Sequence, residues 1–254
     1  MKGKYNNKKV TTTVLLCLSL TGIIKYSDMK EMLNLWEAGS EFLEQGKFKE
    51  NKEELDFSND NLDYSLIVDG DSIHYVVDKD KLVFEEKEYK IIQVDGGDRN
   101  GYRSANVAVD IGFGDRVYWA LTNEYGQLVT VFAEEIILQD NDKEPVNKNG
   151  RYYDDEAYVP GTESKYYDQG HIIADSLGGV ANAYNITPQE SMLNREGNQA
   201  YMEQGIYKAR GCSDFLAYIY YADTTTQIPS SYEYHYILKG NSIRDEFKNE
   251  EPTK

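Results

Sequence analysis

Residues 168–203 read DQGHIIADSLGGVANAYNITPQESMLNREGNQAYME, and the rest of the chain is best understood around them. The segment contains His171, one of only three histidines in the protein. A neutral imidazole can take a proton from water, and Asp168 or a backbone carbonyl could orient the ring. Gly178 and Gly179 follow and permit a tight turn. The pattern predicts two short strands and a loop that bring His171 to a surface cleft.

The second half of this segment predicts a helix that continues to Arg210. The helix could begin at Thr187, with proline at its first position, or nearer Ser191. Its apolar positions are Met192, Leu193, Ala200, Tyr201, Ile206 and Tyr207. Asn194 and Glu203 lie about two and a half turns apart, nearly on opposite faces of an ideal helix. They can share one cation only if Gly197 distorts the helix or if waters bridge the gap.

The charge of the chain restricts the classes of nucleic-acid partner. The formal net charge is -17 and the sequence pI is about 4.6. Proteins that bind the phosphate backbone tightly draw on lysine and arginine to displace counterions. The acidity therefore argues against a sequence-specific DNA-binding protein more than against an enzyme, which needs only a local positive groove and a cation.

The composition and the alternation of apolar residues favour an α+β protein built on an antiparallel sheet. Tyrosine occurs 22 times, and its ring suits half-buried strands. Strands separated by turn residues are predicted over 64–68, 74–77, 81–84, 89–94, 105–111, 117–123, 128–138, 215–221 and 231–238. The first four form a small β-meander, which could be a separate sheet. His74 and His235 lie within strands, where a packing role is expected.

The N-terminus resembles an export signal. A basic start with four lysines precedes an apolar run of about fifteen residues, which is short for a spanning helix. We expect residues 1–25 to be a signal peptide or a membrane anchor, and the protein to be secreted or anchored outside the cell. If these residues are removed, Lys and Arg fall from 27 to 22 against 44 acidic residues, a net charge of -22.

The remaining domain boundaries follow from the same patterns. Residues 26–98 are expected to hold a helix, over about 27–55, and the meander. Residues 99–248 form the main domain, and residues 249–254 a disordered tail. The two cysteines support neither an internal disulfide nor a zinc site, because Cys17 lies in the apolar run and no CxxC or HxxxH spacing occurs.

The order of residues from 168 to 203 resembles that of the DNA/RNA non-specific endonucleases with a ββα-metal finger. This family includes the Serratia-type nuclease, secreted streptococcal DNases and nuclease domains of bacterial polymorphic toxins. The specific part of the match is the succession of D-Q-G-H, G-G, N-I, L-N-R and Y-M-E. A weaker match extends over residues 103–247.

The resemblance assigns roles to individual positions. It implies that His171 is the general base and that Asn185 is a supporting catalytic residue near the histidine. It implies that Asn194 binds Mg²⁺ directly, with Mn²⁺ as a substitute, and that Glu203 is an acidic catalytic residue that holds metal-bound water. The implied reaction is the metal-assisted, sequence-nonspecific hydrolysis of phosphodiester bonds in DNA, with RNA as a second candidate substrate.

One position departs from the family pattern. Gln169 stands where many members carry an arginine that contacts phosphate, although the toxin-like branch also lacks this arginine. The candidates for binding substrate are therefore Gln169 itself and three basic residues, Arg195, Lys208 and Arg103. For each of the three, an ordinary solvated surface charge is the competing interpretation.

Two other functions compete with the nuclease. The first is an acidic, non-enzymatic binding module on the same fold. The second is a small-molecule hydrolase in which His171 activates Ser176 or Cys212, although no nucleophile-elbow motif supports it. If the chain is a toxin, an immunity or inhibitor protein is a candidate partner.

Overall fold

The computed structural model describes residues 61–68 and 70–251. The chain divides into two units at residues 59 and 60, and the described residues belong to the second. The predicted signal or anchor over 1–25 and the helix predicted over 27–55 therefore lie outside the described residues. Among the described residues, no helix is long and apolar enough to cross a membrane.

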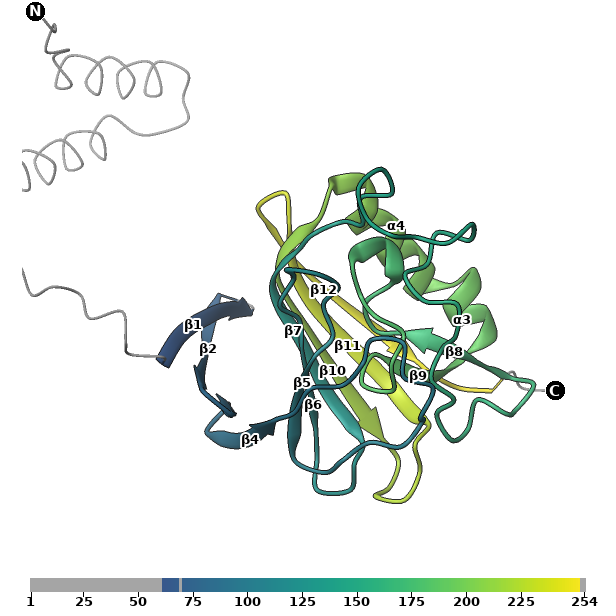
Figure 1. The fold of residues 1–254 in the computed structure, drawn as a ribbon, viewed down its shortest axis with the longest axis horizontal. Helices are drawn as coiled ribbons and strands as arrows, with labels where there is room; N and C mark the ends of the chain where they lie inside the picture. Colours follow the sequence, from purple (N-terminus) through teal and green to yellow (C-terminus); the bar gives the residue numbers. More distant parts are fainter. Residues whose placement is uncertain (1–60, 69, 252–254) are drawn as a thin grey trace, which may run out of the picture. The chain divides into compact units, whose positions relative to one another are not determined.

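A ten-stranded sheet forms the body of the protein (Figure 1). Its strands, in their spatial order, are β1 (Asn61–Val68), β2 (Asp71–Asp78), β3 (Lys81–Phe84), β4 (Lys87–Ile91), β5 (Val107–Asp110), β6 (Trp119–Thr122), β7 (Leu128–Ile136), β10 (Cys212–Tyr221), β11 (Pro229–Leu238) and β12 (Asn241–Lys248). Neighbouring strands are antiparallel except β4 and β5, which are parallel. The predicted antiparallel sheet is present, and the nine predicted strands correspond to β1–β7, β10 and β11.

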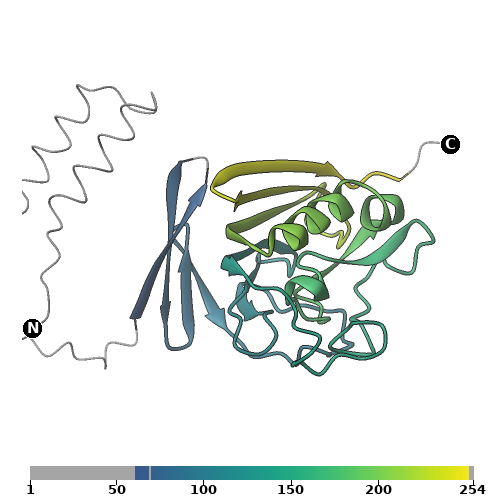
Figure 2. The same ribbon diagram turned by 90° about the horizontal axis from the view of Figure 1, so that it is seen from above.

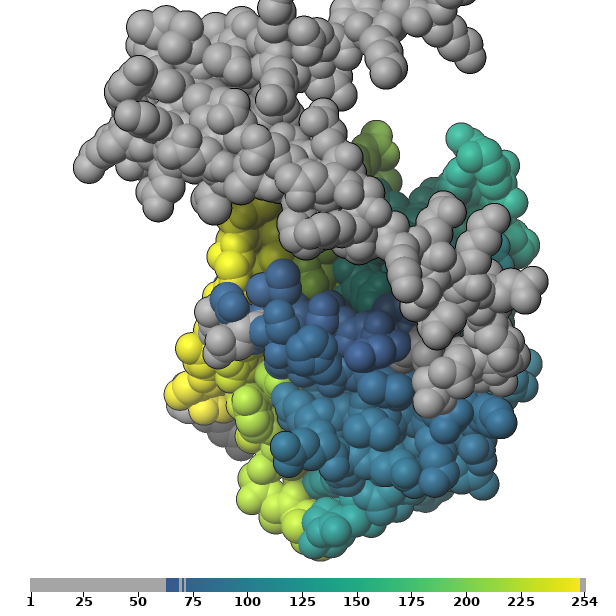
Figure 3. All heavy atoms as spheres, turned by 90° about the vertical axis from the view of Figure 1, so that its left-hand side faces the viewer, coloured from purple at the N-terminus to yellow at the C-terminus, as the bar shows by residue number. Residues whose placement is uncertain are grey.

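The meander β1–β4 continues the main sheet and is not a separate one. Lys90 and Ile91 pair with Val107 and Ala108. Figure 2 shows the meander beside the rest of the sheet, and Figure 3 shows its outer face. Its apolar side chains pack with residues of β5, β6, β7 and β10 in one buried cluster. This cover explains why every residue of β6 is buried.

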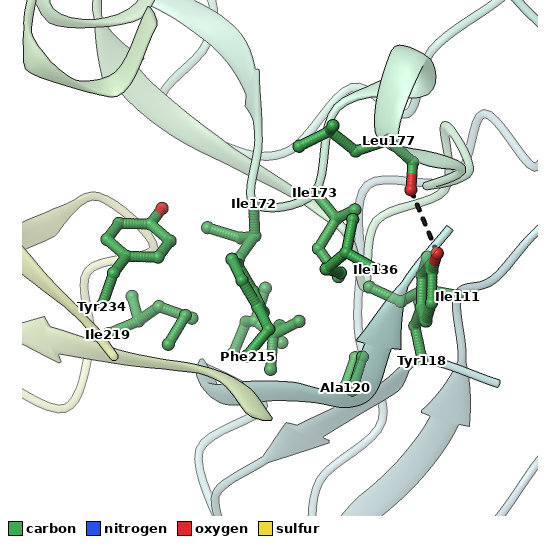
Figure 4. Close-up of a cluster of buried hydrophobic side chains, with 14 of the residues drawn as sticks. Ile111, Tyr118, Ala120, Ile136, Ile172, Ile173, Leu177, Phe215, Ile219 and Tyr234 are labelled. Atoms are coloured by element: carbon green, nitrogen blue, oxygen red, sulfur yellow. Dashed lines mark hydrogen bonds between the residues drawn. The ribbon is translucent and has the colours of Figure 1, made fainter. Parts of the chain in front are cut away.

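The opposite face of the sheet carries a smaller layer that includes a two-stranded sheet. Its elements are β8 (Tyr167–His171), the 3₁₀-helix η1 (Asp175–Leu177), β9 (Ile186–Glu190), α3 (Ser191–Arg195) and α4 (Asn198–Ala209). Ile172 and Ile173, directly after β8, enter the core together with Phe215 and Ile136 of the main sheet (Figure 4). The hydroxyl of Tyr118 donates a hydrogen bond to the Leu177 carbonyl at 3.1 Å and ties η1 to the main sheet.

The helical segment begins later than one of its two predicted starts. Thr187 and Pro188 belong to strand β9, which is buried throughout and pairs with β8, so they do not start a helix. The second predicted start, Ser191, is correct: the Glu190 side chain accepts a hydrogen bond from the Leu193 amide at 2.8 Å. The chain leaves helical geometry at Gly197, between α3 and α4. A break at Gly197, one of the two conditions under which Asn194 and Glu203 could share a cation, is thus present.

The C-terminal part holds a strand that the sequence did not indicate. Strand β12 is rich in charged residues, and its register follows from the hairpin with β11. Asn249, the first residue of the predicted tail, is buried and accepts a hydrogen bond from the Glu190 amide at 2.7 Å. Its amide group donates to the Pro188 and Pro229 carbonyls. The described chain therefore remains tied to the fold at this position.

The attachment of the meander depends on an aromatic cluster. The fully buried ring of Phe132 lies 4.8 Å from that of Tyr75 and 4.7 Å from that of Phe84. Phe132→Ala should lower the free energy of unfolding by about 3–5 kcal/mol, because it leaves a cavity between the two layers. Urea denaturation measures this loss. A loss below about 1 kcal/mol would contradict the packing described here.

Candidate active site

His171 is the last residue of β8 and is nearly buried, with 8% of its surface exposed. It pairs with Ile186 of β9. The next residue, Ile172, already belongs to the core, so the strand holds the imidazole at the boundary between core and surface. The apolar residues that directly follow His171 therefore fix the position of its ring.

Two carboxylates flank the imidazole. Oε1 of Glu156 lies 3.3 Å from Nε2, and Oδ2 of Asp175 lies 3.8 Å from Nδ1. Glu156 comes from the irregular segment before β8 and Asp175 from η1. Arg151 forms an ion pair with Glu156 at 2.6 Å. Four charged or titratable side chains thus meet in a largely buried place.

The carboxylates outweigh burial in setting the charge of the histidine. Burial alone would lower the pKa of His171, but the interactions with Glu156, Asp175 and Glu203 raise it overall. Burial raises the pKa of the Glu156 carboxyl, but His171 and Arg151 stabilise its charged form, so the net pKa is lowered. Glu156 is therefore the ionised partner of the ring.

Glu203 reaches this cluster from α4. Burial raises its pKa to about 7, against the smaller opposing effects of Gln199 and His171. The buried Gln199 amide donates to Oε1 of Glu203 at 2.9 Å and to the His171 carbonyl at 3.5 Å. Burial also raises the pKa of Asp175, whose buried Oδ1 has no hydrogen-bond partner among the described residues. The cluster holds more acidic oxygen atoms than its own hydrogen bonds use.

Asn185 holds the loop that joins β8 to β9. Its side-chain oxygen accepts a hydrogen bond from the Ile173 amide at 3.0 Å, and its amide group donates to the Ile173 and Val180 carbonyls. Its own carbonyl accepts from the Ile172 amide at 2.8 Å. Asn185 lies close to the histidine, as expected, and its side-chain bonds are made with the backbone of the loop.

Asn194 lies on α3, a helix that packs against β8 and β9. Its half-buried side chain makes no hydrogen bond with the described residues. The neighbouring Arg195 donates two hydrogen bonds of 2.6 Å to the carboxylate of Asp168, which fastens α3 to β8. Asn194 is consequently an uncommitted amide on an anchored helix.

The predicted substrate-binding residues are scattered. Arg195 is exposed but paired with Asp168, and Lys208 is exposed in the last turn of α4, where it donates to Gln204 at 2.7 Å. Gln169 donates to the Ala157 carbonyl at 3.1 Å. The guanidinium of Arg103 donates within the fold to the Ala183 and Ile186 carbonyls and to the side chain of Gln227. The structure does not bring Arg103 to the His171 cluster.

Several residues of the cluster were not among the predicted site residues. Asp175 follows His171 by four residues and could have been noticed from its closeness in the sequence. Glu156, Arg151 and Gln199 carry no local signal, because only the fold brings their segments to β8. The described residues contain no group of three or more His, Cys, Asp or Glu arranged to hold a metal ion.

The comparisons with known proteins agree with the motif. Residues 122–231, which include β7–β10 and the whole cluster from Asp168 to Glu203, match the family model of the DNA/RNA non-specific endonucleases. Over these residues the chain is similar to that family. The match supports a nuclease.

Solved structures show a more distant similarity. The chain resembles NucA from Streptococcus agalactiae in its magnesium-bound crystal structure, with 14% identity, a TM-score of 0.41 and coverage of 72% of this chain and 87% of that chain. For the metal-free crystal structure of NucA the identity is 14%, the TM-score 0.38, and the coverage 69% and 82%. No curated protein matches the chain.

The pKa shifts predict a pH dependence of stability. The pKa of Glu203 is raised to about 7, and that of His171 is also raised. At pH values above the ordinary pKa of glutamate, the folded protein therefore binds more protons than the unfolded chain. Stability should therefore fall as the pH rises from about 5 through 7. In metal-free protein, Glu203→Gln should reduce this fall, as measured by urea denaturation at several pH values.

The exposed neighbour Glu196 supplies the control, because Glu196→Gln removes the same charge outside the cluster. An unchanged pH slope in Glu203→Gln would show that Glu203 does not hold a proton in the folded protein.

Proposed function

We propose that this protein is a metal-dependent, sequence-nonspecific endonuclease that hydrolyses phosphodiester bonds of DNA, with RNA as a second substrate. The observation that carries the proposal is the nearly buried His171 between Glu156 and Asp175, within the segment that matches the endonuclease family. Such a histidine is suited to remove a proton from water in a phosphodiester cleavage.

Both ring nitrogens are buried without a hydrogen bond to the described residues, but they differ in their distance from the flanking carboxylates, which suggests different tasks. Glu156 lies close enough to Nε2 to orient the ring and to stabilise the imidazolium that forms when the base takes a proton. Asp175 is 3.8 Å from Nδ1, too far for a hydrogen bond. Nδ1 is therefore the nitrogen that we assign to proton transfer. The raised pKa makes His171 a stronger base than a free imidazole, provided that the pH is high enough to deprotonate it.

The side-chain oxygens of Asn194, Asp175 and Glu203 are of the chemical type that a hard divalent cation binds. Mg²⁺ is bound through oxygen ligands and keeps several waters, so it needs few protein side chains. Asn194 offers an amide oxygen without a hydrogen bond to the described residues, and Asp175 holds a buried oxygen atom without a partner. We propose that Asn194 binds the cation and that Glu203 holds its water. When bound, Mg²⁺ or Mn²⁺ would stabilise the charge that develops on the phosphate and the leaving oxygen.

Substrate binding remains the most demanding step for so acidic a chain. Arg195 and Lys208 lie on the helical segment and reach solvent, so they are the proposed phosphate contacts. Arg195 would have to leave or share Asp168 to make such a contact. Because the chain carries a net charge of -17, we expect weak, salt-sensitive binding and turnover without sequence preference.

The biological setting follows from the sequence-based expectations. We propose that the protein acts outside the cell, either secreted or anchored through residues 1–25. If it serves as a toxin, an immunity or inhibitor protein would protect the cell that makes it.

Digestion of plasmid DNA and of RNA by the full chain tests the reaction directly. Cutting should require Mg²⁺ or Mn²⁺ and stop in EDTA, and His171→Ala should slow it by about 10²–10⁴-fold. His74→Ala, which changes an exposed histidine of β2, should cut like the unmodified protein. Equal cutting by His171→Ala would exclude the proposed base, and no cutting under any metal would favour a binding module.

Glu156→Gln tests whether Glu156 raises the pKa of His171, the proposed general base. Removing this negative charge destabilises the imidazolium, so the pKa of His171 should fall and the rising limb of the pH–rate profile should move to lower pH. The maximal rate should also fall, since the ring loses its orienting partner. Asp155→Asn removes a neighbouring exposed charge and should leave the profile in place. If the pH–rate profile of Glu156→Gln does not move, Glu156 does not influence the pKa of the general base.

A further inference from the structure

A cavity of about 350 Å³ lies apart from the His171 cluster and is lined by two tyrosines, one arginine and uncharged residues. We call it the tyrosine cavity. Three loops and the β6–β7 turn form it. Its lining consists of Gly101, Tyr102, Arg103, Tyr125, Gly126, Pro160, Thr225 and Gln227.

The lining of the tyrosine cavity contains no carboxylate. Four other cavities among the described residues are each lined by at least two acidic residues. In a chain with a net charge of -17, a wall without carboxylates is a place that a phosphate-linked strand can approach with little repulsion.

Two tyrosine rings stand at the cavity and face solvent. Tyr102 is 77% exposed and Tyr125 is 50% exposed. The turn that carries Tyr125 is fixed, because the Asn123 side chain accepts hydrogen bonds from the Tyr125 and Gln127 amides. Exposed aromatic rings on a rigid support are suited to stack with the flat faces of nucleobases, whatever the base.

Arg103 in the lining of the cavity is held rigidly and carries a positive charge. Arg103 donates three hydrogen bonds within the fold, to the Ala183 and Ile186 carbonyls and to Gln227. A guanidinium has five N–H donors, so donors remain for a ligand. Gln227 adds a neutral amide beside it. Such groups recognise the polar edge of a base.

Two chain segments connect the tyrosine cavity to the proposed active site. Arg103 contacts Ile186, the residue that pairs with His171 across the two-stranded sheet. Pro160 of the cavity follows Glu156 by four residues, which span at most about 14 Å. A strand bound at His171 can therefore extend to the cavity within a few nucleotides.

We infer that the tyrosine cavity binds an unpaired nucleobase of the strand that is cut, by stacking on Tyr102 and Tyr125. The inference rests on the proposed function and names its preferred substrate class, single-stranded nucleic acid. In an intact duplex the bases are paired and stacked, so the cavity should contribute little there.

Binding measurements in the full-length His171→Ala protein test this inference. The probes are a fluorescein-labelled oligothymidylate and a strand of equal length made of abasic sites. Adding Tyr102→Ala or Tyr125→Ala should weaken binding of oligothymidylate by about 5–150-fold, with little change for the abasic strand. Tyr102→Phe keeps the ring and should bind like the parent.

Tyr207→Ala is the matched control, because Tyr207 is 47% exposed and lines a cavity with acidic walls. It should bind like the parent. Equal affinities of the parent and of both alanine variants, an equal loss for both probes, or no binding by the parent would each overturn the inference.

Plasmid cutting by the unmodified protein is recorded alongside. If the unmodified protein cuts plasmid but Tyr102→Ala and Tyr125→Ala do not weaken binding of oligothymidylate, the inference is overturned and the proposed nuclease function stands. If these substitutions weaken binding but the unmodified protein does not cut, nucleobase binding by the tyrosine cavity is supported and the proposed nuclease function is rejected.

Discussion

The burial of a charged cluster around His171 is the constraint on which the rest of the structure depends. Removing carboxylates and an imidazole from water is unfavourable unless each finds a partner. Here Glu156 has both His171 and Arg151, and Glu203 has Gln199. Together with Asp175, the cluster draws on four segments, namely the irregular segment before β8, β8 itself, η1 and α4. It therefore exists only when the whole layer is assembled on the sheet.

The scaffold below the cluster explains how this assembly is held. Ile172 and Ile173 anchor the end of β8 in the core, and Asn185 closes the loop that follows through three side-chain hydrogen bonds. Arg195 fastens α3 to β8 through Asp168. A sheet covered on both faces gives a rigid base, which keeps the ring, the carboxylates and the helical segment in register.

Much of the fold could be predicted from the sequence, since alternating apolar residues and turn signals are local. The same signals failed for β12, whose charged residues hide a strand that is set by its hairpin partner. The sequence predicts one of two possible helix starts at Thr187 and Pro188, but tertiary pairing with β8 places these residues in a strand.

The site was predictable only where its residues share a motif. The motif located His171 and Glu203, which the structure brings together, and it placed Asn185 beside them. Glu156 was not predicted because its contact with the histidine depends on long-range folding. For Arg103 the sequence suggests a cation that could bind substrate. It does not reveal that the guanidinium already donates hydrogen bonds to the Ala183 and Ile186 carbonyls. The roles of these residues in catalysis stay predictions.

The central claim, that Asn194 binds a catalytic cation that works with His171, is tested most directly by the anomalous diffraction of crystals soaked in Mn²⁺. The account predicts one strong peak within coordination distance, roughly 2.0–2.3 Å, of the Asn194 side-chain oxygen, and its loss in Asn194→Ala crystals. A well-ordered crystal with no peak there, or with a peak only at distant carboxylates, would contradict it.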